Sequence, residues 1–296
     1  MRIVITGASG FIGQKLCRKL LKNRHEVVAL CRTRIDYIQS NSYRFIPYVM
    51  GQPLPKEAVD FSPEIIIHLA WDGIPDFSEQ KCVDNLHSQI NFFLQLKNFR
   101  GLKKIIGAGT CREYGAKQDL CIENDRTMPD NFFSWAKQSL SVYLKILCQQ
   151  QQIELVWFRI FYVYGEGQRP EALIPTIIRA HRSNKIPEIK NPFAANDYVY
   201  IEDVVNAFIV AIENAGCVGT FNLGSGSAIS VAKVAKLVEQ LIQEDDSTLD
   251  HNSLKAFDIQ SDDGMRADIT LSSSILGWSP RISLPEGIFR TIRAEL

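Results

Sequence analysis

The chain has 296 residues, of which 46% are hydrophobic, so it is long and apolar enough to form a large core without disulfides or metal ions. Lys and Arg together number 33, as do Asp and Glu, which leaves no net positive field of the kind that attracts nucleic acid. Nucleic acid is therefore not an expected partner, and the charge balance favours a small-molecule ligand.

The seven cysteines are scattered through the sequence, are odd in number and form no close pair at metal-ligand spacing. This usage is typical of free thiols in a reducing compartment, and no metal site is expected. The first residues, MRIVITGASG, lack the apolar segment of a secretory signal, and no run of 18 apolar residues occurs. We therefore expect a cytoplasmic protein that does not contact a membrane.

Residues 1–165 alternate short apolar runs with helical periodicity, which is the pattern of a parallel sheet with crossover helices. Ile12, Leu16 and Leu20 share one face of the first expected helix. The predicted fold class is α/β, with a doubly wound parallel (Rossmann) sheet. Its strands are expected at 3–5, 26–30, 65–69, 104–107 and 155–158, and its helices at 11–23, 80–98 and 134–150.

The regular alternation loosens after residue 165. The pattern there predicts a helix at 171–182, a strand at 197–201 and helices at 204–215 and 230–243. The polar stretch 243–253 is expected to be a solvated loop. We predict two interleaved regions: a Rossmann domain from 1–165 plus about 195–215, and a smaller C-terminal region from 166–194 and 216–296.

A glycine-rich loop, TGASGFIG at residues 6–13, follows the first expected strand and opens the first expected helix. Three glycines at this spacing are weak evidence alone, but the strand before and the helix after them favour a dinucleotide site. Gly7 permits the turn, Gly10 lets a pyrophosphate approach, and Gly13 allows close helix packing. The helix N-terminus adds free N–H groups. The residues expected to hold the cofactor here are Gly7, Ser9, Gly10, Phe11 and Ile12.

The end of the second expected strand indicates which dinucleotide is bound, because an acid there holds the ribose hydroxyls and an arginine accommodates a 2′-phosphate. The sequence continues Leu30-Cys-Arg-Thr-Arg34, and no acidic residue occurs before Asp36. This favours NADP over NAD, with Arg32 as the main contact. The alternative is that both arginines are solvated loop residues.

Ten motifs in order resemble the extended short-chain dehydrogenase/reductase family, in particular its NAD(P)-dependent nucleotide-sugar epimerase, dehydratase and reductase branch. The resemblance spans nearly the whole chain. It implies a nucleotide-diphosphate sugar as ligand, substrate binding by the smaller region, and a homodimer formed through the helices near 80–98 and 134–150. The motifs are TGASGFIG (6–13), HLAW (68–71), VDNL (83–86), GAGTCREYG (107–115), SWAKQ (134–138), RIFYVYG (159–165), LIPTII (173–178), NDYVYIEDVV (196–205), FNLGSG (221–226) and LGWSP (276–280).

The resemblance also implies roles for single residues. Thr110 stands four residues before Tyr114, where the family has the Ser or Thr that hydrogen-bonds the sugar oxygen. Lys137 corresponds to the lysine that bonds the nicotinamide ribose and lowers the pKa of the catalytic tyrosine; the alternative is an exposed helix lysine. Leu69 and Ala70 would flank the cofactor. Asn85 would reach toward the active site, or could equally be a structural polar residue.

The catalytic tyrosine of the family lies four residues before its lysine, and here that position is Phe133. Three explanations stay open. Another donor serves, either Tyr162 at the end of an expected strand 159–163, or Cys111, Glu113 or a relayed water. Alternatively, Phe133 is an engineered replacement, or the protein binds nucleotide without catalysing. Phe133 could also simply be a core residue.

The residues after Thr110 restrict the reaction. The 4,6-dehydratases of the family carry Asp-Glu there, and this chain has Cys111-Arg112, which argues against that elimination. We favour an NADP-dependent reductase of a nucleotide-linked keto-deoxysugar. The alternatives are a nucleotide-sugar 4-epimerase with tightly bound NAD and a catalytically silent NAD(P)-binding regulator. The residues expected at the substrate are Tyr162, Arg169, Asn196 and Arg266, and for the last three the alternative is a solvated surface role.

Overall fold

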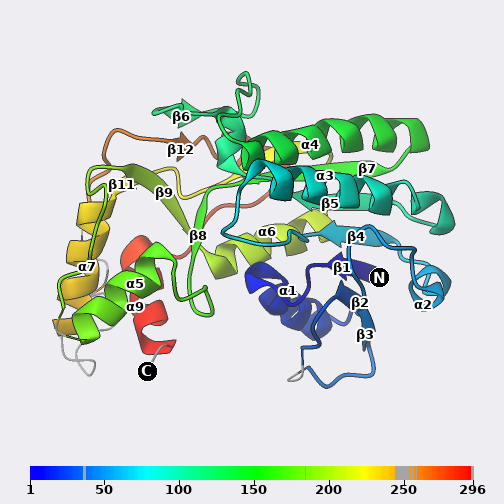
Figure 1. The fold of residues 1–296 in the computed structure, drawn as a ribbon, viewed down its shortest axis with the longest axis horizontal. Helices are drawn as coiled ribbons and strands as arrows, with labels where there is room; N and C mark the ends of the chain where they lie inside the picture. Colours follow the sequence, from blue (N-terminus) through cyan, green and yellow to red (C-terminus); the bar gives the residue numbers. More distant parts are fainter. Residues whose placement is uncertain (36–37, 184, 244–253, 255–256, 258, 295–296) are drawn as a thin grey trace.

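A computed structural model describes the chain except for residues 36–37, 184, 244–253, 255–256, 258 and 295–296. Its centre is a seven-stranded sheet, in which every strand pairs in parallel with its neighbours (Figure 1). The predicted doubly wound parallel sheet is confirmed. In spatial order the strands are β10 (Gly219–Leu223), β7 (Glu154–Ile160), β5 (Lys104–Ala108), β4 (Ile65–His68), β1 (Arg2–Thr6), β2 (Glu26–Cys31) and β3 (Tyr43–Pro47).

Helices cover both faces of this sheet, which is why its strands are apolar without alternation. Ile3 and Ile5 of β1 share a core with α1 (Phe11–Lys22) and α6 (Ile201–Glu213) on one face. Val4 belongs to the core on the other face, under α3 (Glu79–Phe93) and α4 (Phe132–Gln151). Figure 1 shows α3 and α4 side by side on the opposite face from α1. Two shorter helices are α2 (Lys56–Asp60) and the 3₁₀ turn η1 (Leu96–Asn98).

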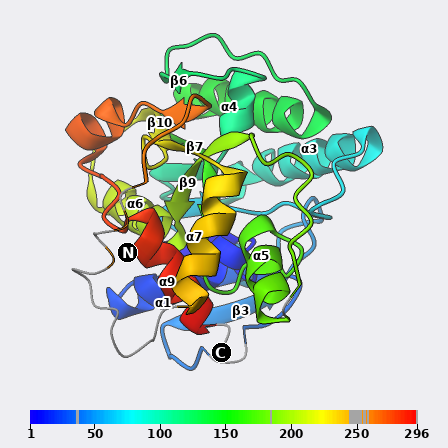
Figure 2. The ribbon, with the colours of Figure 1, turned by 90° about the vertical axis from the view of Figure 1, so that its left-hand side faces the viewer.

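A second group of elements lies at one end of the sheet (Figure 2). Its three-stranded sheet has the order β11, β9, β8, and its core is packed under three helices. A short parallel pair, β6 with β12, lies above it (Figure 1). The elements are β8 (Tyr162–Tyr164), β9 (Ala195–Tyr200), β11 (Ala228–Ser230), α5 (Leu173–Arg182), α7 (Val231–Gln243), α9 (Leu284–Ala294), β6 (Leu120–Cys121) and β12 (Arg266–Ala267).

Two expected boundaries are wrong. The expected strand 159–163 is two strands, because β7 ends at Ile160 and the chain then leaves the large sheet for β8. Phe161 marks the crossing, where its N–H bonds the carbonyl oxygen of Leu223 at 2.9 Å. The helix expected from residue 204 begins at Ile201 instead. Residues 244–253 of the expected polar loop lie outside the described residues.

Candidate functional site

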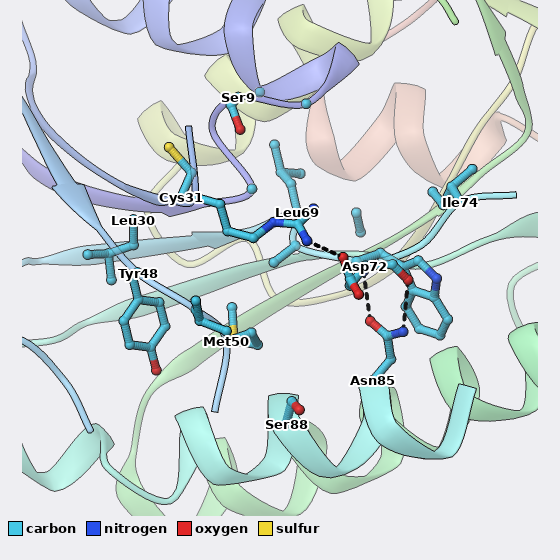
Figure 3. A pocket seen from close by; sticks show the side chains of 18 of the residues that line it. Ser9, Leu30, Cys31, Tyr48, Met50, Leu69, Asp72, Ile74, Asn85 and Ser88 are labelled. Atoms are coloured by element: carbon cyan, nitrogen blue, oxygen red, sulfur yellow. Dashed lines mark hydrogen bonds and ion pairs between the residues drawn. The ribbon is translucent and has the colours of Figure 1, made fainter. Parts of the chain in front are cut away.

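A cavity of about 560 Å³ opens at the carboxyl ends of β1, β2 and β4 (Figure 3). The glycine-rich loop closes one side of it, and α3 closes the opposite side. Cavities at this edge of a parallel sheet are where dinucleotides bind. Nine residues expected at the cofactor line this cavity: Gly7, Ser9, Gly10, Phe11, Ile12, Arg32, Leu69, Ala70 and Asn85.

The geometry of the glycine-rich loop fits a pyrophosphate. Gly7 has a φ of +71°, and a Cβ there would lie 2.7 Å from the backbone nitrogen of Ala70. A Cβ on Gly13 would lie 2.4 Å from the carbonyl oxygen of Gly7, so the helix packs directly on the loop. Gly10 is the N-cap of α1, and no side chain caps that end. The free N–H groups of the helix are therefore available to an anion.

The end of β4 is tied to the end of β1 through a buried histidine. The Nδ1 atom of His68 lies 2.8 Å from the hydroxyl of Thr6, and its Nε2 lies 2.8 Å from Oε1 of Gln89. Burial lowers the pKa of His68 to about 3, so the imidazole is neutral. These bonds hold the segment of Leu69 and Ala70 against the glycine-rich loop.

Arg32 is an ion-pair partner of Asp72, with Nη1 2.5 Å from Oδ1. The other carboxylate oxygen of Asp72 bonds the ammonium of Lys81 on α3. Asn85 holds the backbone of the same residue, because its Oδ1 accepts from the N–H of Asp72 at 2.8 Å and its Nδ2 donates to the carbonyl at 3.0 Å (Figure 3). Asn85 therefore positions the loop after β4. Arg32 carries a carboxylate partner, which counts against its expected role as a free phosphate contact.

Thr110 lies two residues after the end of β5 and is buried. Its hydroxyl caps a 3₁₀ turn, η2 (Cys111–Tyr114), and accepts from the N–H of Arg112 at 3.3 Å. The carboxylate of Glu113 accepts from the backbone of Thr110 at 3.0 Å, from the Trp157 indole at 3.1 Å and from the Arg159 guanidinium at 3.0 Å. This buried network fixes the Thr110 backbone.

The ammonium of Lys137 is buried at the edge of the cavity. It donates to the carbonyl oxygen of Ala108 at 2.9 Å and lies 5.0 Å from the ring centroid of Trp71, and both of these residues line the cavity. Burial lowers the pKa of Lys137 from 10.5 to about 8, although the nearby Glu113 carboxylate acts in the opposite direction. The position is a buried one, so the exposed-lysine alternative is wrong.

Phe133 belongs to an aromatic group beside this ammonium. Its ring packs edge-on to Trp71 with centroids 4.8 Å apart, tilts against Phe77 at 4.6 Å, and lies 6.0 Å from the ammonium of Lys137. It is half-buried. The residue therefore occupies the place beside the lysine that the family resemblance implies, and it offers no hydroxyl there.

All three side chains that were candidate substitute donors, Cys111, Glu113 and Tyr162, are poorly suited to transfer a proton near neutral pH. Burial raises the pKa of the Cys111 thiol to about 12, which removes it from proton exchange near neutrality. Glu113 is fully buried and engaged by three donors. Burial also raises the pKa of Tyr162 to about 12, so this phenol holds its proton tightly. Tyr162 begins β8, and does not end the strand that precedes it.

Three of the four expected substrate residues lie near one another in the structure, and the fourth, Arg169, does not join them. Asn196 on β9 forms a backbone bridge with Met265, and Arg266 follows in β12. Met265 packs in one small apolar cluster with Cys111, and Tyr162 packs against that cluster. The strands that carry Asn196 and Arg266 therefore lie beside the 3₁₀ turn that follows Thr110, and Tyr162 lies beside the same turn. Arg266 itself pairs with Asp119 at 3.3 Å. Arg169 is exposed in the segment before α5.

Several residues of the site were not predicted. Asp72 and Lys81 line the cavity, and no local pattern in the sequence marks them. Trp71 also lines it and ends the HLAW motif, but that motif assigned no role to the tryptophan. Glu113 had a signal, because Thr-x-x-Glu is a capping-box pattern and both of its bonds are present. All seven cysteines are free and buried. Within the described residues, no group of His, Cys, Asp and Glu side chains is arranged to hold a metal, and no helix is long and apolar enough to span a bilayer.

The fold and the cavity define a class of protein: a Rossmann-fold dinucleotide-binding protein with a threonine and a buried lysine beside the cofactor cavity. Residues 3–224 match the model of the NAD dependent epimerase/dehydratase family, and the chain belongs to that family. The expected relationship to extended short-chain dehydrogenases is thereby confirmed, as is the expectation, at family level, of an oxidoreductase or epimerase that acts on nucleotide sugars.

Three relatives illustrate the range of the family. The chain is 28% identical to a dTDP-4-dehydro-6-deoxyglucose reductase of Escherichia coli, over 99% of this chain and 96% of the relative. It is 26% identical to a UDP-glucose 4-epimerase of Mycolicibacterium smegmatis, over 99% and 97%. A Tyr-to-Phe variant of a Bacillus cereus UDP-glucuronic acid 4-epimerase, solved with a fluorinated UDP-sugar and NAD, superimposes with a TM-score of 0.83 at 23% identity, covering 99% of this chain and 98% of the other.

Proposed function

We propose that this protein is a reductase of nucleotide-linked 4-keto-deoxysugars that uses a nicotinamide dinucleotide. One observation carries the proposal: a buried ammonium, that of Lys137, lies at the cofactor cavity where the tyrosine of the family is absent. Reduction of a ketone adds a hydride to the carbonyl carbon and one proton to its oxygen. The E. coli relative is named for a reaction of this class, and it matches almost the whole chain.

Lys137 is the proton donor in this proposal. Its pKa of about 8 leaves it mostly protonated at pH 7 and yet acidic enough to release a proton to a substrate oxygen. Thr110 hydrogen-bonds the same oxygen and orients it, while Glu113 fixes the backbone of Thr110. A bound dinucleotide supplies the hydride, and the cavity residues hold it. The smaller region, with Arg266 and Asn196, binds the nucleotide-diphosphate end of the substrate.

A 4-epimerase is the second candidate, and the ion pair of Arg32 favours it. An epimerase keeps NAD bound. Because Arg32 pairs with Asp72, its guanidinium is not free to bind a 2′-phosphate, and the reason to favour NADP is removed. The M. smegmatis relative is named as a 4-epimerase, and the B. cereus structure contains NAD. For the cofactor we accordingly propose NAD, in place of the NADP that Arg32 alone favours. Epimerisation requires one group both to remove and to return the proton, which is more demanding without a tyrosine.

One set of assays separates the candidates. The purified protein is mixed with NADH or NADPH and a 4-keto-6-deoxy nucleotide sugar, and absorbance at the nicotinamide band is followed. Net consumption of the reduced cofactor supports the reductase. Interconversion of UDP-glucose and UDP-galactose without net consumption supports the epimerase instead. If the protein binds the dinucleotide but catalyses neither reaction, the remaining candidate is the catalytically silent NAD(P)-binding regulator.

Phe133→Tyr tests whether Lys137 already supplies the proton. Because the proposal gives the wild-type site a donor, we expect the added hydroxyl to change kcat by less than about tenfold at pH 7. Phe132→Tyr, on the exposed neighbouring residue, is the matched control. A rise of about 10²-fold or more in the 133 variant alone would show that the wild-type site lacks a donor, and Lys137 would lose that role.

The outer faces of α3 and α4 carry exposed apolar side chains, which supports a homodimer through these helices. Val83 on α3, and Val142 and Ile146 one turn apart on α4, are each at least 40% exposed. We expect Ile146→Asp to convert a dimer to a monomer in light scattering, because it places a charge in an apolar interface. Ile186→Asp makes the same change at a position that is 96% exposed, and should have no effect. A monomeric wild type would refute the dimer.

A further inference from the structure

Asp72 is the centre of a small charged group at the mouth of the cofactor cavity. One of its carboxylate oxygens pairs with Arg32 from the end of β2, and the other bonds Lys81 from α3. The hydrogen bond from Lys81 is the main cause that lowers the pKa of Asp72, so the carboxylate is ionised at neutral pH. The three side chains carry one negative and two positive charges.

The position of Asp72 is fixed from both its backbone and its side chain. Asn85 bonds its N–H and its carbonyl, at 2.8 and 3.0 Å. Gly73 has a φ of +87°, which favours glycine, and a Cβ there would lie 2.1 Å from Cε of Lys81, so a side chain at this position would displace the lysine from its path to Asp72. The backbone of Asp72 is therefore held at the mouth of the cavity, and its carboxylate is directed to Arg32 and Lys81.

Arg32 stands where a 2′-phosphate would be recognised, since it follows directly after β2, the second strand of the chain. A phosphate carries about −1.5 to −2 charge at pH 7 and would have to share the guanidinium with a fixed carboxylate. The side chain of Arg32 is 65% exposed and that of Asp72 is 44% exposed, and Asn85 holds the backbone of Asp72, so a negative charge stays near the guanidinium. A ribose 2′-hydroxyl is neutral and meets no such repulsion.

We propose that Asp72 determines the dinucleotide preference of this protein, by neutralising Arg32 and repelling a 2′-phosphate, so that NAD is bound in preference to NADP. This inference rests on the proposed dinucleotide site, but on neither proposed reaction. Asp72 is a specificity-determining residue here, although it follows β4 and lies 40 residues from the arginine that it controls.

The test measures the dissociation constants of NAD⁺ and NADP⁺ by titration calorimetry, after any co-purified nucleotide has been removed. For Asp72→Asn we expect the ratio Kd(NADP⁺)/Kd(NAD⁺) to fall by about tenfold or more, and the change to shrink as salt is raised. Adding Arg32→Met to Asp72→Asn should return the ratio to near its wild-type value. Asp76→Asn removes the same charge from the same loop, where the side chain bonds Ser78, and should leave the ratio unchanged.

The outcomes are distinguishable. A ratio that Asp72→Asn leaves unchanged, or that Asp76→Asn changes equally, overturns the role of Asp72 while the dinucleotide site stands. If the ratio stays low in the double variant that also carries Arg32→Met, the effect of Asp72 does not act through Arg32, and the inference as stated is overturned. If wild type binds neither dinucleotide, the proposed cofactor site falls, and the role of Asp72 falls with it.

Discussion

Replacing Lys137 by Met is expected to lower kcat for keto-sugar reduction by about 10²–10⁴ at saturating dinucleotide. The reason is that methionine has a similar length but neither a charge nor a proton to transfer. Loss of the ammonium removes the group that transfers a proton to the substrate oxygen in this proposal, and the Thr110 hydroxyl is left only to orient that oxygen. The measurement is steady-state kinetics at saturating cofactor, with binding measured separately. Lys145→Met, on the exposed face of the same helix, is the control.

The pH dependence gives this prediction a second readout. Because the ammonium is the donor and its pKa is about 8, the rate of reduction should fall as pH rises through about 8. The charged groups that act on it are few: Glu113 raises its pKa, and His68 stays neutral because its own pKa is about 3. The Met variant should lack this transition. If the variant keeps wild-type kcat with the same pH profile, the proton comes from elsewhere.

As pH rises above about 8, the free energy of unfolding should increase while the rate of reduction falls. The folded state depresses the pKa of Lys137 from 10.5 to about 8, so between these values the unfolded chain binds more protons and the free energy of unfolding rises with pH. Below pH 8 the buried charge costs stability, and Lys137→Met removes that cost. We expect a Tm at pH 7 no lower than that of wild type, and a difference that narrows from pH 8 to 10.5. A lower Tm would show instead that the bond to Ala108 outweighs the desolvation.

The parts of this fold that could be predicted are those specified by local sequence. Apolar strands such as 3–5 and 65–69 indicate a sheet covered on both faces, and the glycine-rich loop marks its phosphate-binding edge. The boundary at Ile160 could not be predicted in this way. The run from Ile160 to Tyr164 is apolar and aromatic throughout, and only the pairing of Tyr162 with Tyr198 in a different sheet divides it.

The site was predictable where one residue acts alone and unpredictable where residues act as a group. Each glycine of the loop has a conformational reason visible in its spacing. The significance of Arg32 depends on Asp72, which is distant in sequence and reaches it only because β2 and β4 flank β1 in the sheet. The depressed pKa of Lys137 likewise comes from burial behind Trp71 and Ala108, which no local pattern reports.

Gly10→Ala and Gly13→Ala are expected to damage the glycine-rich loop in different ways, although they lie one helical turn apart. A Cβ at Gly10 would meet only the carbonyl oxygen of Gly7, at 3.2 Å, and would otherwise project into the cavity. We therefore expect a nearly unchanged Tm and a dinucleotide affinity reduced by about 10²-fold or more, since the methyl group would stand where the pyrophosphate must approach.

At Gly13 the new Cβ would lie 2.4 Å from the oxygen of Gly7 and 2.7 Å from that of Ala8, and both are backbone atoms that cannot rotate away. Helix α1 must move off the loop, so the free energy of unfolding should fall by about 2 kcal/mol or more, as overpacking of a core does. Thermal melts and calorimetric titrations of the two variants separate these effects. Equal losses of Tm would mean that Gly10 is also a packing residue, and full affinity in Gly10→Ala would place the pyrophosphate away from this helix.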